Sequence, residues 1–324
     1  MLSGISTLST PLDIMSFVII PYSIGFLYNL LLKRIIAVED TFKKTLFLFL
    51  AVEDLETLTK KIDQKLRTLT RHEHVHLTDR GNSAIFLAMH IAKKMNPKAD
   101  ILIPDQGGWF SYKGYPQFFG FNIVEVKTDY GIIDLKDLKR KAKTGSCFIF
   151  SSFAGYFAEQ PLRKIKTICK KAGCLMIEDA SGAIGDTKLC NGNYSDIIVG
   201  SFGKWKPVEC GYGGWISVKS KEYFDVAQEA LSITKVHPQF YREIGEALKN
   251  NKFKKLLALQ NTVKQELKDF EVLHRDSRGL NVVVKFDPRV LAYCIEKKYP
   301  YVLCPSYIRV NERAVSIELK RLSF

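Results

Sequence analysis

The sequence lacks any closely spaced pair of cysteines. Its seven cysteines are scattered along the chain, their number is odd, and none belongs to a C-x-x-C motif. This arrangement supports neither a disulfide framework nor a cysteine-rich zinc site. Because free cysteines fit a reducing environment best, the sequence predicts a cytoplasmic protein.

Internal repeats, low-complexity linkers and an excess of acidic residues are also missing. Apolar residues make up 46% and charged residues 25% of the 324 positions, which is ordinary globular usage and excludes a disordered or collagen-like chain. Lysine and arginine outnumber aspartate and glutamate by 48 to 34, giving a net charge of +14. Such a charge attracts phosphates, nucleic acids or anionic lipids. No RNP, KH or zinc-finger pattern is present, so no specific nucleic-acid motif is predicted.

One segment near the N-terminus is almost wholly apolar. Ile14 to Leu32 approaches the roughly 20 residues that a membrane-spanning helix needs. Pro21 and Gly25 interrupt it, and neither the basic n-region nor the cleavage site of a signal peptide is evident. We therefore expect a buried helix or a dimer surface here, with contact between residues 14–34 and an anionic membrane as the alternative.

The hydropathy pattern divides the chain into three parts. Residues 1–74 show a helical pattern, including a charged amphipathic segment at 54–69, and predict an N-terminal helical layer. Residues 75–220 alternate short aliphatic runs with helical stretches, which predicts a large α/β domain with a mainly parallel sheet flanked by helices. Residues 221–324 predict a small α+β C-terminal domain.

Short aliphatic runs mark the strands of the predicted sheet, and runs this continuous are typical of strands buried on both faces. They occupy residues 101–103, 123–126, 147–150, 174–177, 197–199 and 215–218. The predicted helices of this domain occupy residues 84–95, 135–143 and 161–172, and a long helical region is expected at 223–271.

Polar residues follow several of these strands, at the edge where open α/β sheets bind ligands. The small residues of 80–84 open a helix and leave backbone N–H groups for an anion. Asp179 ends a buried strand, where its carboxylate needs a positive or N–H partner. Lys206 lies on the loop after the next strand, between the hydroxyl of Ser201 and a glycine-rich segment at 211–214. A lysine in such a place loses its charge readily and can form a Schiff base.

The order of these pieces resembles the DegT/StrS-type sugar aminotransferases. Their motifs read roughly S-G-T-A-A-L, E-D-A-A-Q-A and S-F-x-x-x-K-x-x-x-x-G-E-G-G, and the matching segments here are residues 80–85, 178–183 and 201–214. The resemblance covers residues 75–220 well. It implies an α/β fold of the aspartate-aminotransferase-like type I, with pyridoxal 5'-phosphate as the cofactor.

Carried over position by position, the resemblance implies a role for each residue. Lys206 is the Schiff-base lysine and the base that moves the proton at the reacting carbon. Asp179 is the partner of the pyridinium nitrogen and keeps the ring protonated as an electron sink. The phosphate cradle consists of Ser201 with the backbone at Asn82 and Ser83, and the neighbouring Gly81 and Ser181 complete the cofactor-binding set.

The role of Trp109 and the identity of the reacting lysine each have an alternative. The family stacks an aromatic side chain on the cofactor ring, and Trp109 supplies it here if one residue is inserted; the alternative is an ordinary core tryptophan. Lys204 is the rival of Lys206, but its spacing from Ser201 and the glycines differs from the family motif.

The sequence departs from the family pattern at several positions. Gly182 replaces the family glutamine that touches the cofactor hydroxyl, and Tyr212 replaces the glutamate of G-E-G-G. The segment G-Y-N-Y-R-M, whose asparagine reaches the partner subunit's cofactor, is represented only by residues 240–242.

The resemblance implies a homodimeric aminotransferase that moves an amino group from an amino-acid donor to a keto sugar nucleotide. A relative that binds the cofactor but is inactive, and an enzyme acting on a tRNA-linked substrate, remain as alternatives. Arg242, Arg309 and Arg313 are all candidates for the substrate carboxylate. His72, His74 and His76 alternate as ligands on a strand would, but no further histidine or cysteine lies near them and no metal site is predicted.

Overall fold

A computed structural model describes residues 31, 33–44 and 55–323. The chain divides into two units, Met1–Thr57 and Leu58–Phe324. Within the described ranges, no helix is long and apolar enough to cross a membrane. The apolar segment Ile14 to Leu32 lies outside these residues except for Leu31, so its expected role stays a prediction.

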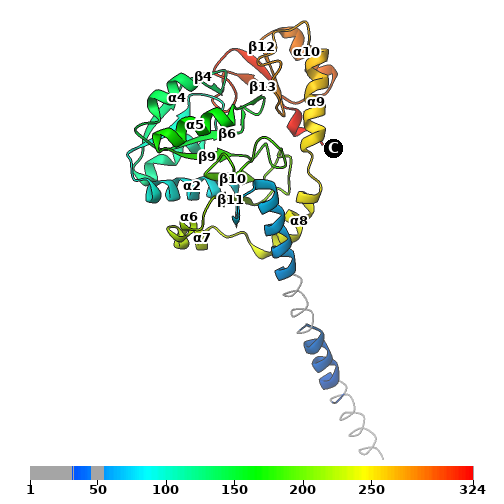
Figure 1. Cartoon of the computed structure of the whole chain (residues 1–324). Coiled ribbons are helices and arrows are strands. Elements are labelled where there is room, and N and C mark those ends of the chain that lie inside the picture. Colours follow the sequence, from blue (N-terminus) through cyan, green and yellow to red (C-terminus); the bar gives the residue numbers. More distant parts are fainter. Residues whose placement is uncertain (1–30, 32, 45–54, 324) are drawn as a thin grey trace, which may run out of the picture. The chain divides into compact units, whose positions relative to one another are not determined.

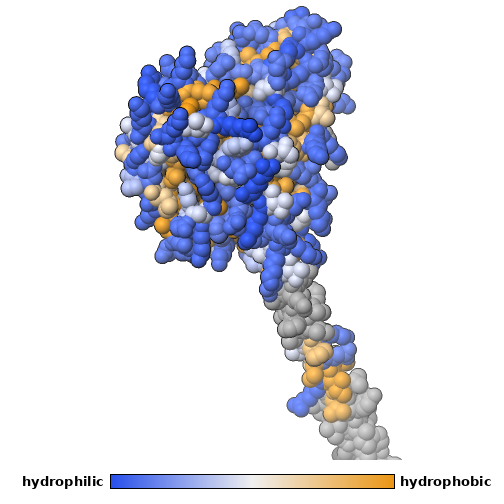
Figure 2. Space-filling model, viewed as in Figure 1, coloured by the Kyte–Doolittle hydropathy of each residue, from blue (hydrophilic) through white to orange (hydrophobic). Residues whose placement is uncertain are grey.

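The first unit contains a helical segment at residues 33–44 with one apolar side. Leu31, Ile35, Val38 and Phe42 are all more than half exposed and recur at helical spacing. Figure 2 shows apolar side chains gathered on this segment. An apolar stripe of this kind is typical of a helix that packs against another apolar surface.

A seven-stranded sheet forms the centre of the second unit, in the order β1-β11-β10-β9-β6-β2-β3. The pairs from β10 to β3 are parallel, whereas β11 runs antiparallel to both β10 and β1. Each predicted aliphatic run is a strand in the structure, which confirms the mainly parallel sheet. The strands are β1 His74–Thr78, β2 Asp100–Pro104, β3 Asn122–Val126, β6 Gly145–Ser151, β9 Leu175–Asp179, β10 Ile197–Ser201 and β11 Gly214–Val218.

Helices cover both faces of this sheet (Figure 1). Side chains of α2 Gly81–Met95 share one core with Cys147 and Ile149 of β6. The alternate residues Phe148 and Phe150 point to the opposite core, with side chains of α4 Leu135–Lys141 and α5 Leu162–Ala172. This alternation follows from the two-residue period of a strand. Because β3 is an edge strand, Ile123 is 41% exposed, and the expectation that every run is buried on both faces is wrong there.

The C-terminal part contains a second, antiparallel sheet in the order β12-β14-β13. Its strands are β12 Val282–Lys285, β13 Tyr301–Cys304 and β14 Ala314–Ile317. Helices α9 Phe253–Glu266 and α10 Pro288–Glu296 contribute to its apolar core. The α+β character predicted for this region is therefore present. The domain boundaries at 74 and 220 stay predictions.

The region 223–271 is not one long helical stretch. Pro238 starts a 3-10 turn there because proline lacks the N–H that a continuing helix requires. Asn251 then accepts a hydrogen bond from the Phe253 amide at the start of α9, which separates this helix from α8. The pieces before α9 are α6 Glu222–Asp225, α7 Gln228–Ile233, η2 Pro238–Phe240 and α8 Tyr241–Lys249.

Residues 55–70 form a helix, and several short elements connect the longer ones. The small strands pair as two hairpins, β4 with β5 and β7 with β8. Their bounds, with those of the remaining short helices, are α3 Ser111–Gly114, η1 Pro116–Phe119, β4 Thr128–Asp129, β5 Ile132–Ile133, β7 Phe153–Ala154, β8 Ala158–Glu159 and η3 Leu319–Arg321.

Candidate active site

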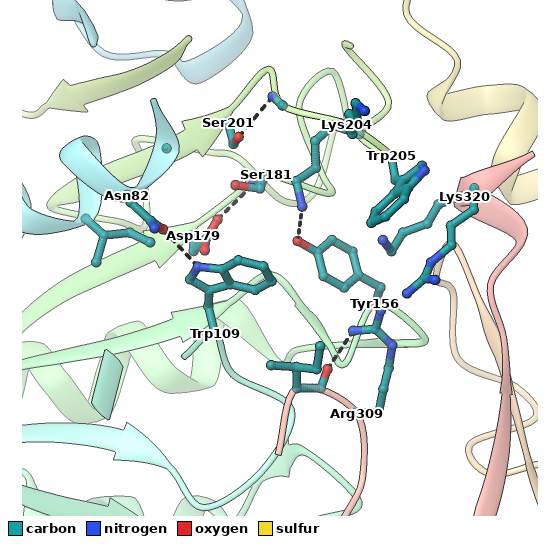
Figure 3. Close-up of a pocket in the computed structure, with 16 residues that line it drawn as sticks. Asn82, Trp109, Tyr156, Asp179, Ser181, Ser201, Lys204, Trp205, Arg309 and Lys320 are labelled. Atoms are coloured by element: carbon teal, nitrogen blue, oxygen red, sulfur yellow. Dashed lines mark hydrogen bonds between the residues drawn. The ribbon is translucent and has the colours of Figure 1, made fainter. Parts of the chain in front are cut away.

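A cavity of about 280 Å³ lies at the carboxyl ends of β9 and β10, beside the start of α2. All the predicted cofactor residues except Ser83 line it. The amide of Ser83 donates to the Arg80 carbonyl inside the first helical turn, at 3.1 Å. Figure 3 shows Asn82, Trp109, Asp179 and Ser201 on one side of the cavity. We call Gly81, Asn82, Asp179, Ser201 and Lys206 the strand-end wall.

Asp179 ends β9 as a buried carboxylate whose partners are neutral. Its Oδ2 accepts a hydrogen bond from the Tyr112 hydroxyl at 2.7 Å, and its Oδ1 accepts one from the Ser181 amide at 3.0 Å. Burial beside this charge raises the pKa of Tyr112 well above its usual value, so the phenol remains a donor. No lysine or arginine in the described ranges forms an ion pair with Asp179. The Ser181 amide supplies the predicted N–H partner, and a positive partner is left to a ligand.

Lys206 lines the cavity from the loop that follows β10. Its ammonium donates to the Tyr156 hydroxyl at 2.6 Å and lies 5.4 Å from the centre of the Trp109 ring. Lys204 also lines the cavity, but it is exposed. The structure therefore gives Lys206, and not Lys204, a partly buried amine held in a defined position.

The start of α2 and the end of β10 approach each other closely. A Cβ atom at Gly81 would lie 2.5 Å from the Cβ of Ser201, so only glycine fits there. The Ser201 hydroxyl accepts a hydrogen bond from the Gly203 amide at 3.1 Å. A helix start beside a hydroxyl and a turn of small residues is suited to an anion such as a phosphate.

Trp109 is held by a hydrogen bond and not only by packing. Its indole Nε1 donates to Asn82 Oδ1 at 2.9 Å, and the same oxygen accepts a hydrogen bond from the Ser111 hydroxyl at 3.0 Å. The indole thus lines the cavity with Asp179 and Lys206. This position favours the predicted stacking role over that of a core tryptophan.

The opposite side of the cavity comes from the C-terminal part of the chain. Arg309 lies between β13 and β14, and Lys320 and Arg321 lie on η3 (Figure 3). We call these three residues the C-terminal wall. Glu318 lies behind them, and Arg309 binds both of its carboxylate oxygens at 2.7 Å. Burial alone would raise the pKa of Glu318, but the hydrogen bonds and charge of Arg309, and then the charge of Lys320, lower it to about 2.

Arg309 is one of the three candidate arginines of the sequence, whereas Lys320 and Arg321 were not predicted. Of the other two arginines considered, Arg313 packs on the Phe286 ring, and neither Arg313 nor Arg242 lines this cavity. Lys320 and Arg321 come shortly after the last strand, β14, much as Asp179 and Ser201 stand at the ends of β9 and β10. This position after a strand is the sequence signal that could have predicted them.

Tyr156 was also missed. Its ring lies against Gly182, where an added Cβ would be 3.0 Å from Tyr156 Cδ1. Tyr156 has a left-handed backbone with a φ of 69°, which is uncommon for a bulky residue and occurs at functional sites. A phenol thus occupies the space beside Gly182. The loss of the family glutamine at 182 was the signal that another polar group takes this place.

Comparison with known proteins now identifies the family. A model of the DegT/DnrJ/EryC1/StrS aminotransferase family matches residues 55–263, which is more than half of the chain. The chain belongs to this family. A second model, the MJ1341 family C-terminal domain, matches residues 250–324. A search of curated protein sequences gave no significant match.

Solved structures of DegT-type aminotransferases and their relatives share the fold. A DegT DnrJ EryC1 StrS aminotransferase from Brucella abortus is 17% identical, with a TM-score of 0.60 over 81% of this chain and 84% of its own. NtdA from Bacillus subtilis, with PMP bound, is 17% identical, with a TM-score of 0.61 over 83% and 77%. DesI, with its TDP-sugar product, is 15% identical, with a TM-score of 0.61 over 81% and 79%. The predicted fold of PLP-dependent type I enzymes is confirmed.

Family membership also gives the cofactor, which is pyridoxal 5'-phosphate. The residues present fit this group. Asp179 offers a buried carboxylate that lacks a cationic partner among the described residues, Lys206 offers an amine, and Gly81 with Ser201 forms a narrow anion cradle. When bound, this cofactor supplies an electron sink for a reacting amine.

Proposed function

We propose that this protein is an aminotransferase that moves an amino group from an amino acid to a keto sugar attached to a nucleotide. In this exchange the donor becomes the matching 2-oxo acid and the sugar carbonyl becomes an amine, so atoms and electrons balance without another reactant. The observation that carries the proposal is the placement of Asp179, Lys206 and Trp109 around one cavity.

Each residue of the strand-end wall has a distinct task in this proposal. Lys206 would hold the cofactor through its amine and would move the proton at the reacting carbon. The carboxylate of Asp179, held by Tyr112 and the Ser181 amide, stabilises positive charge on the ring nitrogen. Ser201, Gly81 and Asn82 hold the phosphate, and Trp109 covers the ring.

Separate observations favour a sugar nucleotide and the cytoplasm, and the homodimer is proposed from the family resemblance alone. DesI, which shares this fold, was solved with a TDP-sugar product. The net charge of +14 favours a ligand that carries phosphates. All seven cysteines are free thiols, as in a reducing compartment.

An absorbance spectrum with added pyridoxal phosphate tests the proposal. We expect a band of lysine-bound cofactor that borohydride reduction fixes, and that peptide mapping assigns to residue 206. Lys206→Ala should abolish the band, whereas the matched variant Lys204→Ala should keep it. A missing band, or one that persists in Lys206→Ala, would exclude the proposed role.

Amino-group transfer itself needs a second measurement. The protein with bound cofactor should convert L-glutamate to 2-oxoglutarate in a single turnover. The change in the absorbance spectrum of the cofactor measures this conversion. If the lysine-bound band forms but none of the common amino acids changes it, the chain binds the cofactor without catalysing the transfer.

A further inference from the structure

The C-terminal wall places three cations around a single carboxylate. Arg309 takes both oxygens of Glu318 at 2.7 Å. Arg321 Nε lies 3.2 Å from Glu318 Oε2, and Lys320 Nζ lies 3.8 Å from the same oxygen. One negative charge therefore faces three positive charges, and the bidentate arginine satisfies it.

Lys320 and Arg321 are left without adequate partners. Within the described residues, the ammonium of Lys320 makes no hydrogen bond, although the residue is only 6% exposed. Arg321 Nε is buried and likewise makes no hydrogen bond among those residues. Burial first, and then the charge of Lys206, lowers the pKa of Lys320 well below its usual value. Buried cations in this condition are stabilised by an added anion.

Two aromatic rings define where this anion would lie. Trp205, whose φ of 63° is left-handed, presents its ring to Arg321 at 4.5 Å and to Lys320 at 5.7 Å. Lys320 and Lys206 contact the ring of Tyr156 at 4.6 and 4.7 Å from its centre. The two ammonium groups therefore share one ring. An anion held by Lys320 lies only a short distance from the amine that takes part in the reaction.

We propose that Lys320 and Arg321 bind the carboxylate attached to the reacting carbon of the amino-acid substrate. This inference rests on the proposed function, because it takes Lys206 as the reacting amine. A carboxylate bonded to the reacting carbon lies close to that amine, whereas the phosphates of a nucleotide lie beyond a whole sugar ring. The planar guanidinium of Arg321 also matches the geometry of a carboxylate. Arg309 is a positioning residue, since Glu318 already occupies its guanidinium.

Calorimetric titration with 2-oxobutyrate and its methyl ester tests this assignment on the protein with bound cofactor. A 2-oxo acid has no amine to give, so the titration measures binding alone. The ester removes the charge and adds one methyl group. The wild type should bind the acid roughly tenfold or more tightly than the ester. Lys320→Met and Arg321→Gln should each remove most of this preference.

Arg313→Gln is the matched control, because Arg313 is an exposed arginine of the same region that packs on Phe286 outside the cavity. It should keep the preference of the wild type. The Arg321 side chain is 27% exposed, so its variant remains informative if Lys320→Met fails to fold. Equal binding of acid and ester by the wild type, or an unchanged preference in Arg321→Gln, would overturn the assignment.

Inorganic phosphate separates a carboxylate site from a phosphate site. With the cofactor bound and its phosphate cradle filled, phosphate should not displace 2-oxobutyrate at equal concentration. Displacement would assign the two cations to a phosphate of the acceptor and overturn the proposal. If the lysine-bound band never forms, the proposed function fails by itself. The same acid and ester titrations on the protein without cofactor then still report on Lys320 and Arg321.

Discussion

The two walls of the cavity are built on different principles. The strand-end wall consists of single residues at the ends of parallel strands and at the start of α2, and each has neutral partners. The C-terminal wall is a cluster of like charges gathered around one buried carboxylate. The first wall suits a ligand that every member of the family shares. The second carries the charge that we propose binds the substrate carboxylate.

This contrast predicts different consequences for changes in each wall. A residue of the strand-end wall should affect catalysis while leaving the stability of the fold nearly unchanged. The carboxylate of the C-terminal wall should affect stability first, because several buried cations depend on it.

The largest effect is expected from Asp179→Asn in the strand-end wall. The amide keeps the shape of the carboxylate but loses the charge that stabilises a positive ring nitrogen. We expect turnover to fall on the order of 10³-fold at full cofactor occupancy, with little change in the urea midpoint of unfolding. Turnover within tenfold of the wild type would show that Asp179 does not tune the cofactor.

The next largest effect is expected from Glu318→Gln behind the C-terminal wall. Removing this charge leaves Arg309, Lys320 and Arg321 without a counter-ion, and urea titration should show a loss of about 3 kcal/mol in the free energy of unfolding. The exposed pair of Glu246 and Lys249 gives a matched control, since Glu246→Gln should cost less than about 1 kcal/mol. Equal losses of unfolding free energy in the two variants would show that Glu318 contributes no more than an exposed ion pair does.

The carboxylate of Glu318 should also make the free energy of unfolding depend on pH in the acid range. Unfolding of the wild type measured at several pH values should reveal this dependence. The pKa of Glu318 falls from 4.5 to about 2 in the folded protein, mainly through Arg309. Its stabilising contribution is therefore complete above pH 4.5 and is lost as the pH falls towards 2. In Glu318→Gln this part of the pH dependence should be missing.

A smaller effect is expected from Tyr156→Phe, which lies between the walls. Phenylalanine keeps the ring beside Lys320 but removes the oxygen that accepts the hydrogen bond from Lys206. We expect roughly a tenfold loss of turnover and a stability change of about 1 kcal/mol or less. A stability loss without a change in turnover would make Tyr156 a packing residue only.

The sequence allowed the strand-end wall to be predicted because its residues stand at positions that a parallel sheet enforces. Asp179 and Ser201 end their strands, and Gly81 opens a helix, so periodicity and motif spacing locate all three. Ser83 shows the limit of this reasoning. It belongs to the same motif, yet the first turn of α2 directs its amide to Arg80.

The C-terminal wall could not be assembled from the sequence in the same way. Arg309, Lys320 and Tyr156 meet only because the β12-β14-β13 sheet and the loop after β6 converge on the cavity. Their separations along the chain carry no periodic signal. Glu318 was missed for a related reason, since a buried carboxylate with three cations looks in sequence like any polar strand end.

Gly182 and Tyr156 occupy one shared volume, and this couples two positions that lie far apart along the chain. Any side chain introduced at 182 meets the phenol, and a smaller residue at 156 leaves the space beside Gly182 unfilled. Substitutions at the two positions are therefore coupled, in evolution and in protein engineering alike. A library that aims to change the substrate of this enzyme has to vary them together, while position 81 stays fixed.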